Sequence, residues 1–275
     1  MKLAGKVAFI TGAARGQGRS HAVTLAAEGA DIIAVDLCAP LDTVGYPLAT
    51  EEDLAETVRQ VEALDRRIVA RVADVRDTAG LRAAVDEGVA ELGRLDIVAA
   101  NAGILSSGST QELTEAAWRE MIDVNLSGVW RTCKVAIPHV IAGGRGGSLI
   151  LTSSVAGLKS YPNVGHYVAA KHGVVGLART LATELGPYGI RVNTVNPTQV
   201  DTDMIQNDVM YHLFVPDEDN PTKEQFAAAS RATGLLPVDW IESRDVSEVV
   251  LFLASDAARY LTGIALPIDA GATLR

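Results

Sequence analysis

Tyr167 and Lys171 stand four residues apart in a stretch, Gly165 to Leu185, whose apolar spacing predicts a helix. Residues at this spacing lie on one face of a helix, about one turn apart. A tyrosine has a pKa near ~10 and is a poor base at neutral pH. A nearby ammonium favours the phenolate and lowers that pKa, which suits the pair to general acid–base catalysis. Helices without a catalytic role also carry this spacing, so the spacing alone does not identify a catalytic pair.

A glycine-rich segment, Thr11 to Gly18, follows an apolar run that predicts a strand and precedes a stretch that predicts a helix. Glycines allow a close approach of the backbone to a pyrophosphate, and the helix aims its N-terminal N–H groups at the phosphate. A glycine cluster by itself is often only a turn, but this placement favours dinucleotide binding. The residues expected to bind the cofactor here are Gly12, Arg15, Gly16, Gln17 and Gly18.

Asp36 ends the next predicted strand, 18 residues after Gly18. The dinucleotide-binding fold needs a carboxylate there to hydrogen-bond the adenosine ribose, and this carboxylate would repel the 2′-phosphate of NADP. Leu37 follows, so no cation stands where that phosphate would need one. Arg15 is the opposing signal, because an arginine in the glycine loop could reach the phosphate. We give Asp36 more weight and predict NAD. The repulsion between Asp36 and an unpaired phosphate costs more free energy than a contact from a flexible surface arginine contributes.

Two later strand ends also carry small or polar residues. Asn101, Ala102 and Gly103 follow the predicted strand Leu95 to Ala100, where small residues would let the backbone pass close to a ribose. The same tripeptide is also common in turns. Ser154 lies at the carboxyl end of the predicted strand Ser148 to Ser153, where its hydroxyl could face a ligand.

Short β-branched runs alternate with longer Ala-rich amphipathic stretches along the chain. Buried strands separated by helices predict a parallel sheet covered on both faces, and the right-handed crossover rule makes that sheet doubly wound. We therefore predict an α/β fold, a single-domain Rossmann fold over residues 1–275 that binds ligands at the carboxyl ends of its strands. The predicted strands are Lys6–Thr11, Asp31–Asp36, Ile68–Ala73, Leu95–Ala100, Ser148–Ser153, Ile190–Asn196 and Ile264–Ile268. The predicted helices are Gln17–Glu28, Thr50–Asp65, Thr78–Leu92, Trp118–Ile141, Gly165–Leu185, a short one capped by Thr222, and Asp245–Ser255. Pro138 is expected to kink or shorten the helix Trp118–Ile141.

Two irregular stretches interrupt this pattern. The first, residues 37–49, follows Asp36 and contains two prolines. The second begins at Thr198 and extends to about residue 220, within a substrate loop of about 198–240. Stretches of this length in a compact domain are usually functional or mobile. From Asp201 to Gln225 there are seven acidic residues and one basic residue, which indicates a solvated loop. The same segment is also interpreted as a mobile lid whose apolar members Met204, Met210, Leu213 and Phe214 cover the substrate, and both interpretations can hold at once.

Composition excludes several classes of protein. The chain has 275 residues, 48% of them apolar and 21% charged, which excludes disorder and coiled coil. A net charge of −10 repels a phosphate backbone, so nucleic acid is not an expected partner. Cys38 and Cys133 are expected to be free thiols in a reducing compartment. No histidine pair has metal-ligand spacing and no apolar run suits a signal or membrane segment, so we expect a cytoplasmic protein without a metal.

The ordered set of glycine loop, Asp36, Asn101-Ala102-Gly103, Asn125, Ser154 and Tyr167 with Lys171 resembles the short-chain dehydrogenase/reductase family, over Lys6 to about Gly271. The resemblance implies that Tyr167 is the catalytic acid/base and that Lys171 lowers its pKa and binds the nicotinamide ribose. Ser154 would hydrogen-bond the substrate oxygen as charge develops on it. Asn125 would hold a water in a proton relay with Lys171.

The resemblance also implies further cofactor contacts. Asp74 and Val75 would contact the adenine. Leu37, the residue after the ribose-binding Asp36, is also expected to bind the cofactor. Pro197 to Thr202 matches the family's Pro-Gly-x-x-x-Thr segment, so Pro197, Val200 and Thr202 would surround the nicotinamide amide; Thr198 replaces the usual glycine. The expected assembly is a homotetramer.

The spacing from Asp36 to Asp74 is longer than is common in the family, and the extra segment from Leu37 through Pro47 resembles the carveol dehydrogenase-like, mycofactocin-associated branch. Members of that branch resemble nicotinoproteins, which keep NAD bound through turnover and need an external redox partner. The expected reaction interconverts a small apolar secondary alcohol and a ketone. The expected pocket residues are Val155, Leu158, Tyr161, Met204, Met210 and Trp240.

Two alternatives remain open. An NADP-dependent 3-ketoacyl-thioester reductase would need a cation after the second strand and a basic docking surface, and Asp36 and the net charge argue against both. A non-catalytic dinucleotide sensor on the same fold would be favoured by loss of Ser154, Tyr167 or Lys171, and all three are present.

Overall fold

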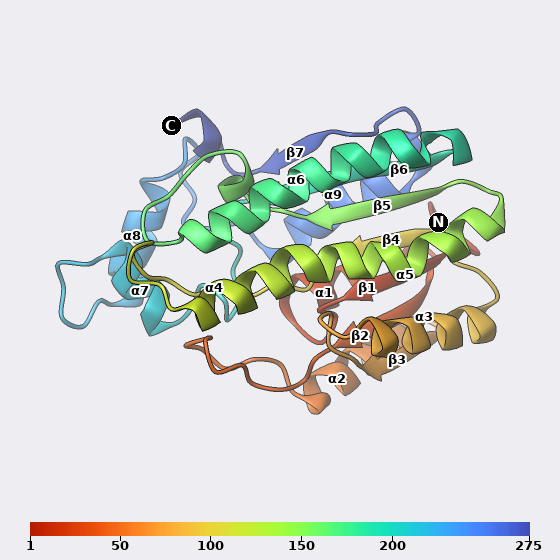
Figure 1. Cartoon of the computed structure of the whole chain (residues 1–275), viewed down its shortest axis with the longest axis horizontal. Helices are drawn as coiled ribbons and strands as arrows, with labels where there is room; N and C mark the ends of the chain where they lie inside the picture. Colours follow the sequence, from red (N-terminus) through yellow and green to blue (C-terminus); the bar gives the residue numbers. More distant parts are fainter.

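The computed structural model describes all 275 residues, and its centre is one sheet of seven strands (Figure 1). The strand order is β3-β2-β1-β4-β5-β6-β7, and every neighbouring pair is parallel. The prediction of an α/β doubly wound parallel sheet is confirmed. The strands are β1 Val7–Thr11, β2 Asp31–Asp36, β3 Ile68–Val72, β4 Ile97–Ala100, β5 Gly147–Thr152, β6 Ile190–Pro197 and β7 Ala265–Ile268.

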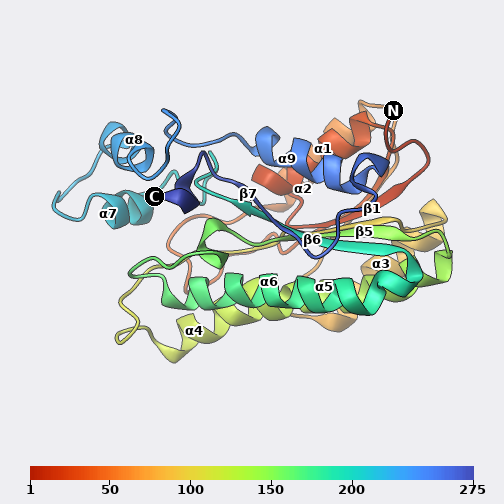
Figure 2. The same ribbon diagram turned by 90° about the horizontal axis from the view of Figure 1, so that it is seen from above.

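Helices cover both faces of the sheet, as Figure 2 shows. One face carries α1 (Gly16–Ala27), α2 (Glu51–Glu62) and α9 (Ser243–Ala254). The other face carries α3 (Thr78–Leu92), α4 (Glu115–Ile122), α5 (Gly128–Gly143) and α6 (Gly165–Leu185). The short helices α7 (Asp208–Phe214) and α8 (Lys223–Arg231) lie beyond the end of the sheet. None of the helices is both long enough and apolar enough to cross a membrane.

The strand order reverses at β1. β2 and β3 lie on one side of β1, and β4 to β7 lie on the other. The loops that leave the carboxyl ends of β1 and β4 therefore diverge and open a crevice, which is where sheets of this kind bind ligands.

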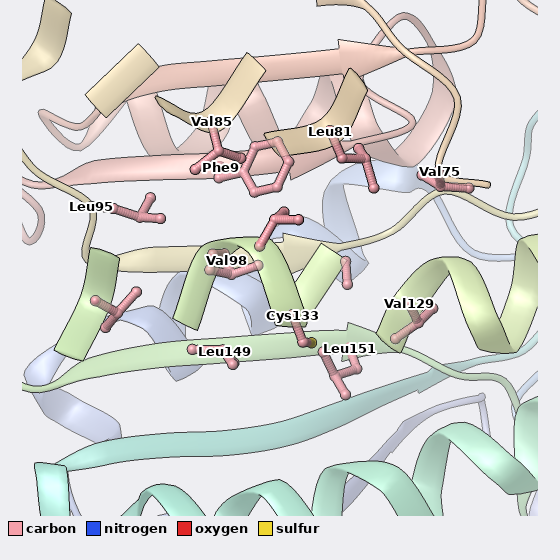
Figure 3. Packing of buried hydrophobic residues seen from close by; sticks show 14 of the residues in the cluster. Phe9, Val75, Leu81, Val85, Leu95, Val98, Val129, Cys133, Leu149 and Leu151 are labelled. Atoms are coloured by element: carbon pink, nitrogen blue, oxygen red, sulfur yellow. The ribbon is translucent and has the colours of Figure 1, made fainter. Parts of the chain in front are cut away.

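The apolar core has two halves, one on each face of the sheet. Alternate residues of a strand point to opposite faces. Val7 and Phe9 of β1 accordingly join the half under α3 and α5, and Ala8 and Ile10 join the half under α1 and α9. Because both faces are covered, β1 is buried along its whole length. Figure 3 shows part of the first half, with Phe9, Leu81, Val85, Leu95, Val98, Cys133, Leu149 and Leu151 packed together.

The region Trp118–Ile141 differs from the single helix that the sequence predicts. It contains the end of α4, a π-helical turn at Asp123–Ser127 and most of α5. The expected shortening at Pro138 is wrong, because α5 runs on to Gly143. Proline removes one backbone hydrogen bond, and the buried side of α5 packs against the sheet strongly enough to offset that loss. The stretch after Thr198 also contains a helix that the sequence analysis missed, α7.

His21 of α1 offers a test of the contact between α1 and α9. Its side chain is fully buried, and its Nδ1 lies 2.8 Å from Oγ of Ser247 in α9. Burial lowers the pKa of His21 to about 4. Between pH 6.5 and 4 the unfolded chain therefore binds more protons at this residue than the folded chain, so the free energy of unfolding falls as the pH drops through this window.

We expect this loss to approach roughly 3 kcal/mol at pH 4, since one pKa unit corresponds to about 1.4 kcal/mol. Denaturant unfolding at several pH values measures it. The variant His21→Asn keeps a polar group near Ser247 but cannot titrate, so its stability should change less over the same window. Equal pH slopes for the variant and the wild type would contradict the assignment.

Candidate active site

The turn between β1 and α1 depends on glycines for two separate reasons. Gly12 and Gly16 have φ of +68° and +53°, in the left-handed region that favours glycine. Gly18 is helical, but a Cβ added there would lie 1.8 Å from the carbonyl oxygen of Gly12. A Cβ on Gly12 would in turn lie 2.8 Å from Cα of Ala102, after β4. These glycines therefore let the ends of β1, α1 and β4 meet closely.

A cleft opens at this point, and it collects most of the residues predicted to bind the cofactor. Arg15 and Asp36 lie in its wall, together with residues of the 37–49 insertion and of the loop after β6. The predicted cofactor residues that line it are Gly12, Arg15, Gly16, Gln17, Gly18, Asp36, Leu37, Asp74, Val75, Asn101, Ala102, Gly103 and Thr202.

The cleft suits a dinucleotide. Oε1 of Gln17, at the start of α1, is buried and has no hydrogen-bond partner in the protein, although Gln17 lines the cleft. An unpaired buried polar atom costs free energy, so a ligand that supplies a donor there is favoured. The glycine turn leaves room that a Cβ would fill. Asp36 is fixed by the N–H groups of Ala14 and Cys38, at 2.9 and 3.3 Å, which hold its carboxylate at the end of β2.

Asp74 is held by a residue that the sequence analysis did not select. Nη2 of Arg76 lies 2.7 Å from a carboxylate oxygen of Asp74, and its Nη1 donates to Glu120 of α4 at 2.7 Å. Burial acts to raise the pKa of Asp74, but the hydrogen bonds from Arg76 outweigh it and lower that pKa below its usual value. Asp74 therefore stays ionised at the edge of the cleft.

The predicted catalytic residues converge beside this cleft. Tyr167 and Lys171 come from the first turns of α6, and Ser154 follows β5. The Ser154 hydroxyl is a hydrogen-bond partner of the Tyr167 phenol. Nζ of Lys171 lies 5.5 Å from the centre of the Tyr167 ring and donates to the carbonyl oxygen of Thr152 at 2.8 Å. All three side chains line a second cavity, together with Pro197 and Val200.

Asn125 lies in the π-helical turn and connects it to the loop after β4. Its Oδ1 accepts from the N–H of Ile104, and its Nδ2 donates to the carbonyl oxygen of the same residue, both at 2.8 Å. A Cβ on Gly103 would lie 3.2 Å from Oδ1 of Asn125 and 3.6 Å from Nζ of Lys171. Asn125 is thus close to Lys171 and fixes the backbone between them. Its part in a water relay stays a prediction.

Burial is the largest influence on the pKa of both members of the Tyr167–Lys171 pair. It raises the pKa of Tyr167 above its usual value, while the hydrogen bond with Ser154 acts in the opposite direction. It lowers the pKa of Lys171 to about 8. The net lowering of the Tyr167 pKa expected from the spacing is therefore not found, because desolvation of the phenol dominates and the ammonium is engaged by Thr152.

The second cavity has a volume of about 400 Å³, and apolar residues form half of its lining, while Asn163, Gln199 and Thr233 are among the polar ones. Four of the six residues predicted for the substrate pocket line it: Val155, Tyr161, Met204 and Met210. Leu158 and Trp240 do not, which corrects the prediction. Trp240 instead stacks on Phe226, with ring centres 5.8 Å apart, in a small core under α7 and α8. The loop also brings Leu213 and Phe214 to the lining, as the lid interpretation of this segment expects, together with Ile205, which had not been predicted.

Fold and site together define a dinucleotide-dependent oxidoreductase, and comparison with known proteins identifies its family. Residues 6–210 match the family model for short chain dehydrogenases. The chain belongs to that family, which confirms the prediction of a short-chain dehydrogenase/reductase.

Individual relatives are similar over the whole chain. The sequence is 56% identical to (-)-trans-carveol dehydrogenase of Rhodococcus erythropolis over 275 residues, which cover 100% of this chain and 99% of that protein. A crystal structure of carveol dehydrogenase from Mycobacterium avium in complex with NAD has a TM-score of 0.98 and 58% identity, covering 100% and 99% of the two chains. A short chain dehydrogenase from Mycobacterium paratuberculosis bound to NAD has a TM-score of 0.92 and 49% identity, covering 100% of each chain.

Proposed function

We propose that the enzyme uses NAD to interconvert a small apolar secondary alcohol and the corresponding ketone. The observation that carries the proposal is the position of Ser154, Tyr167 and Lys171 between the second cavity and the cleft that the glycine turn and Asp36 line. The similar proteins named carveol dehydrogenase and the similar structures that contain NAD support both parts.

The chain's own residues handle the proton and the substrate oxygen. NAD, when bound, supplies the hydride acceptor or donor. The phenolate of Tyr167 takes the hydroxyl proton during oxidation, and the phenol formed in this way returns the proton during reduction. Ser154 donates a hydrogen bond to the substrate oxygen as charge develops on it. The hydrogen bond with Ser154 opposes the effect of burial on the pKa of Tyr167, and Lys171 holds a positive charge near the ring, with its Nζ 5.5 Å from the ring centre.

The cavity limits the substrate class. A volume of about 400 Å³ lies within the usual range for small-molecule sites. The aliphatic, methionine and phenylalanine side chains of its wall favour a hydrocarbon skeleton, and Ser154 and Tyr167 at its catalytic end offer hydrogen bonds to an oxygen. A cyclic secondary alcohol fits both parts of the cavity, because it has a hydrocarbon ring and a single oxygen. A long thioester would have to leave the cavity past the acidic 201–225 segment.

A single-turnover assay tests this function. Purified protein with NAD is mixed with a cyclic secondary alcohol, and absorbance follows the formation of reduced nicotinamide. We expect a stoichiometric signal with the secondary alcohol and none with a primary alcohol on the same ring. Faster oxidation of NADPH by a 3-ketoacyl thioester than of NADH by a cyclic ketone would instead favour the thioester reductase.

The 37–49 insertion supports tight retention of the cofactor. Leu41 and Val44 pack against the main core, and Tyr46 is only 7% exposed. The hydroxyl of Tyr46 accepts a hydrogen bond of 3.2 Å from the N–H of Leu105, which joins the insertion to the loop after β4. Thr43 also bonds Glu120, the residue that holds Arg76. The insertion is thus fastened across the cleft at several points, and we propose that it slows the release of NAD.

We therefore expect NAD to co-purify with the protein and to stay bound through gel filtration. Deletion of residues 38–46 should speed NAD dissociation while single-turnover hydride transfer persists. The smaller change Tyr46→Ala should raise the dissociation rate at least about tenfold, because a buried aromatic side chain contributes roughly 1.5–3 kcal/mol. Stopped-flow displacement of bound NADH measures both rates.

Tyr188→Ala is the matched control, because Tyr188 is 54% exposed and remote from the cleft. It should leave the dissociation rate within about a factor of two, as surface substitutions usually do. If dialysis of the wild type gives apoprotein that turns over normally with added NAD, the retention proposal is wrong and an ordinary dehydrogenase remains.

Three further proposals concern the surroundings of the enzyme. Retention of NAD requires an external redox partner that reoxidises the bound cofactor. Exposed aromatic side chains on two helical layers, Trp118 and Trp130 on one and Phe252 on the other, would be covered in a homotetramer. The two free thiols suit a reducing cytoplasm. Light scattering of the purified protein tests the assembly.

A further inference from the structure

Arg15 of the glycine loop is tied to two segments that are distant in sequence. Its Nη1 lies 2.8 Å from a carboxylate oxygen of Asp203, in the loop after β6, and its Nη2 donates to the carbonyl oxygen of Pro47 in the insertion. The side chain of Arg15 is 23% exposed, while that of Asp203 is 64% exposed. Both residues line the cofactor cleft, so this ion pair lies at its wall.

The other arginine of this region is also engaged. Arg19 donates to the carbonyl oxygens of Ala14 and Asp53, and its Nη2 lies 3.6 Å from the Asp53 carboxylate. Arg15 and Arg19 are the cations that the glycine loop and the first turns of α1 place near the end of β2. Both are therefore bonded within the protein.

Carboxylates dominate the remaining charge at the end of β2. The thiol of Cys38 is next to Asp36, whose Oδ1 accepts from the Cys38 N–H. Its pKa is raised to about 12, first by burial and then by Asp36, Glu51 and Asp53. A further phosphate at this place would meet the same negative field. It would be tolerated only if a guanidinium turned toward it, because arginine binds phosphate through paired hydrogen bonds.

Arg15 is the side chain placed to do this. It directly follows Ala14, whose N–H is bonded to the carboxylate of Asp36 at 2.9 Å, so its stem begins beside the expected adenosine ribose. In the observed structure its guanidinium points instead to Asp203 and Pro47.

We propose that Asp203 is a specificity-determining residue, which excludes cofactors with a 2′-phosphate by holding Arg15 away from the ribose. This inference rests on the proposed use of NAD. Selectivity against the 2′-phosphate then has two sources. Asp36 repels the phosphate directly, and Asp203 keeps the guanidinium of Arg15 from binding it. Substitution of Asp36 alone should therefore weaken NAD binding without making NADP a good ligand.

A competition experiment tests the role of Asp203. The protein is incubated with equal concentrations of NAD and NADP until the ratio of bound forms is constant, and native mass spectrometry measures that ratio. Asp203→Asn keeps the size of the side chain and removes its charge. We expect the ratio to move roughly tenfold toward NADP, the effect of about one charge-assisted hydrogen bond. Asp217→Asn removes an exposed charge from the same loop and should change the ratio less than about twofold.

A double-variant cycle separates the mechanism from simple repulsion. With Arg15→Gln in place, Asp203→Asn should no longer shift the ratio, because no guanidinium is released. A shift that persists in this background, an equal loss of both cofactors, or no shift at all would each overturn the proposal. The measurement needs no turnover, and a constant ratio is independent of the exchange rate. Failure of the proposed reaction or of NAD retention would therefore be recognised separately.

Discussion

Tyr167→Phe should abolish most of the alcohol oxidation while NAD remains bound. The substitution removes the one oxygen proposed to accept the substrate proton and keeps the half-buried ring over which Nζ of Lys171 lies. General acid–base catalysis contributes roughly 10²–10⁴-fold, so we expect single-turnover hydride transfer to slow by at least that lower factor. Stopped-flow absorbance of the reduced nicotinamide measures the rate, and mass spectrometry measures the bound NAD.

Tyr161→Phe provides the matched control for this variant. Tyr161 lines the same cavity and is half-buried, and burial raises its pKa as well, yet no hydrogen bond joins it to Ser154 or Lys171. Its loss of hydroxyl should change the rate only slightly. A Tyr167→Phe enzyme that retains more than about half of the wild-type rate would exclude Tyr167 as the acid/base, because such a change lies far below the usual catalytic contribution.

Gly18→Ala should destroy the cofactor cleft through a single methyl group. The new Cβ would lie 1.8 Å from the carbonyl oxygen of Gly12. The Cβ is attached directly to the backbone and the oxygen is part of it, so neither atom can rotate away. The start of α1 or the turn before it has to move, which displaces the N–H groups expected to face the pyrophosphate. Overpacking of this kind typically costs 1–3 kcal/mol and occasionally more, so we expect NAD affinity to fall by roughly 10–100-fold or beyond.

Gly176→Ala is the corresponding control in α6, where a Cβ would have no neighbour within 4 Å. Alanine is a better helix former than glycine by about 1 kcal/mol, so this variant should bind NAD normally and unfold at the same or a higher temperature. Thermal unfolding with and without added NAD compares the two proteins. Unchanged NAD stabilisation of Gly18→Ala would show that the turn does not bind the cofactor.

Sequence patterns were sufficient for the fold because the information that sets it is local. The apolar runs of β1 and β2 have no polar face, and only a sheet covered on both sides can bury them. The glycine turn was recognisable for the same reason, since the positive φ of Gly12 and Gly16 favours glycine over other residues. The four-residue spacing of Tyr167 and Lys171 likewise put both side chains on one side of α6.

Other properties depend on which distant segments meet. The substrate cavity is closed by the loop after β6, and nothing near Leu158 or Trp240 in the sequence indicated that they would lie outside it. Burial of Tyr167 reverses the pKa change that its spacing to Lys171 suggested, because desolvation comes from surrounding elements. Pro138 lies within a helix because packing of α5 on the sheet offsets one lost hydrogen bond.

The sequence by itself therefore determined the Rossmann architecture, because periodicity and residue type act over a few residues. It also predicted the glycine turn as the dinucleotide site and the Tyr167–Lys171 pair as the reactive side chains. Only the tertiary structure decided what Arg15 does. Its charge was compatible with either cofactor, and its partners, Asp203 and Pro47, come from segments far away in the chain. An ion pair depends on distance in space, and that distance is set when the sheet brings β1, the insertion and the loop after β6 to one edge.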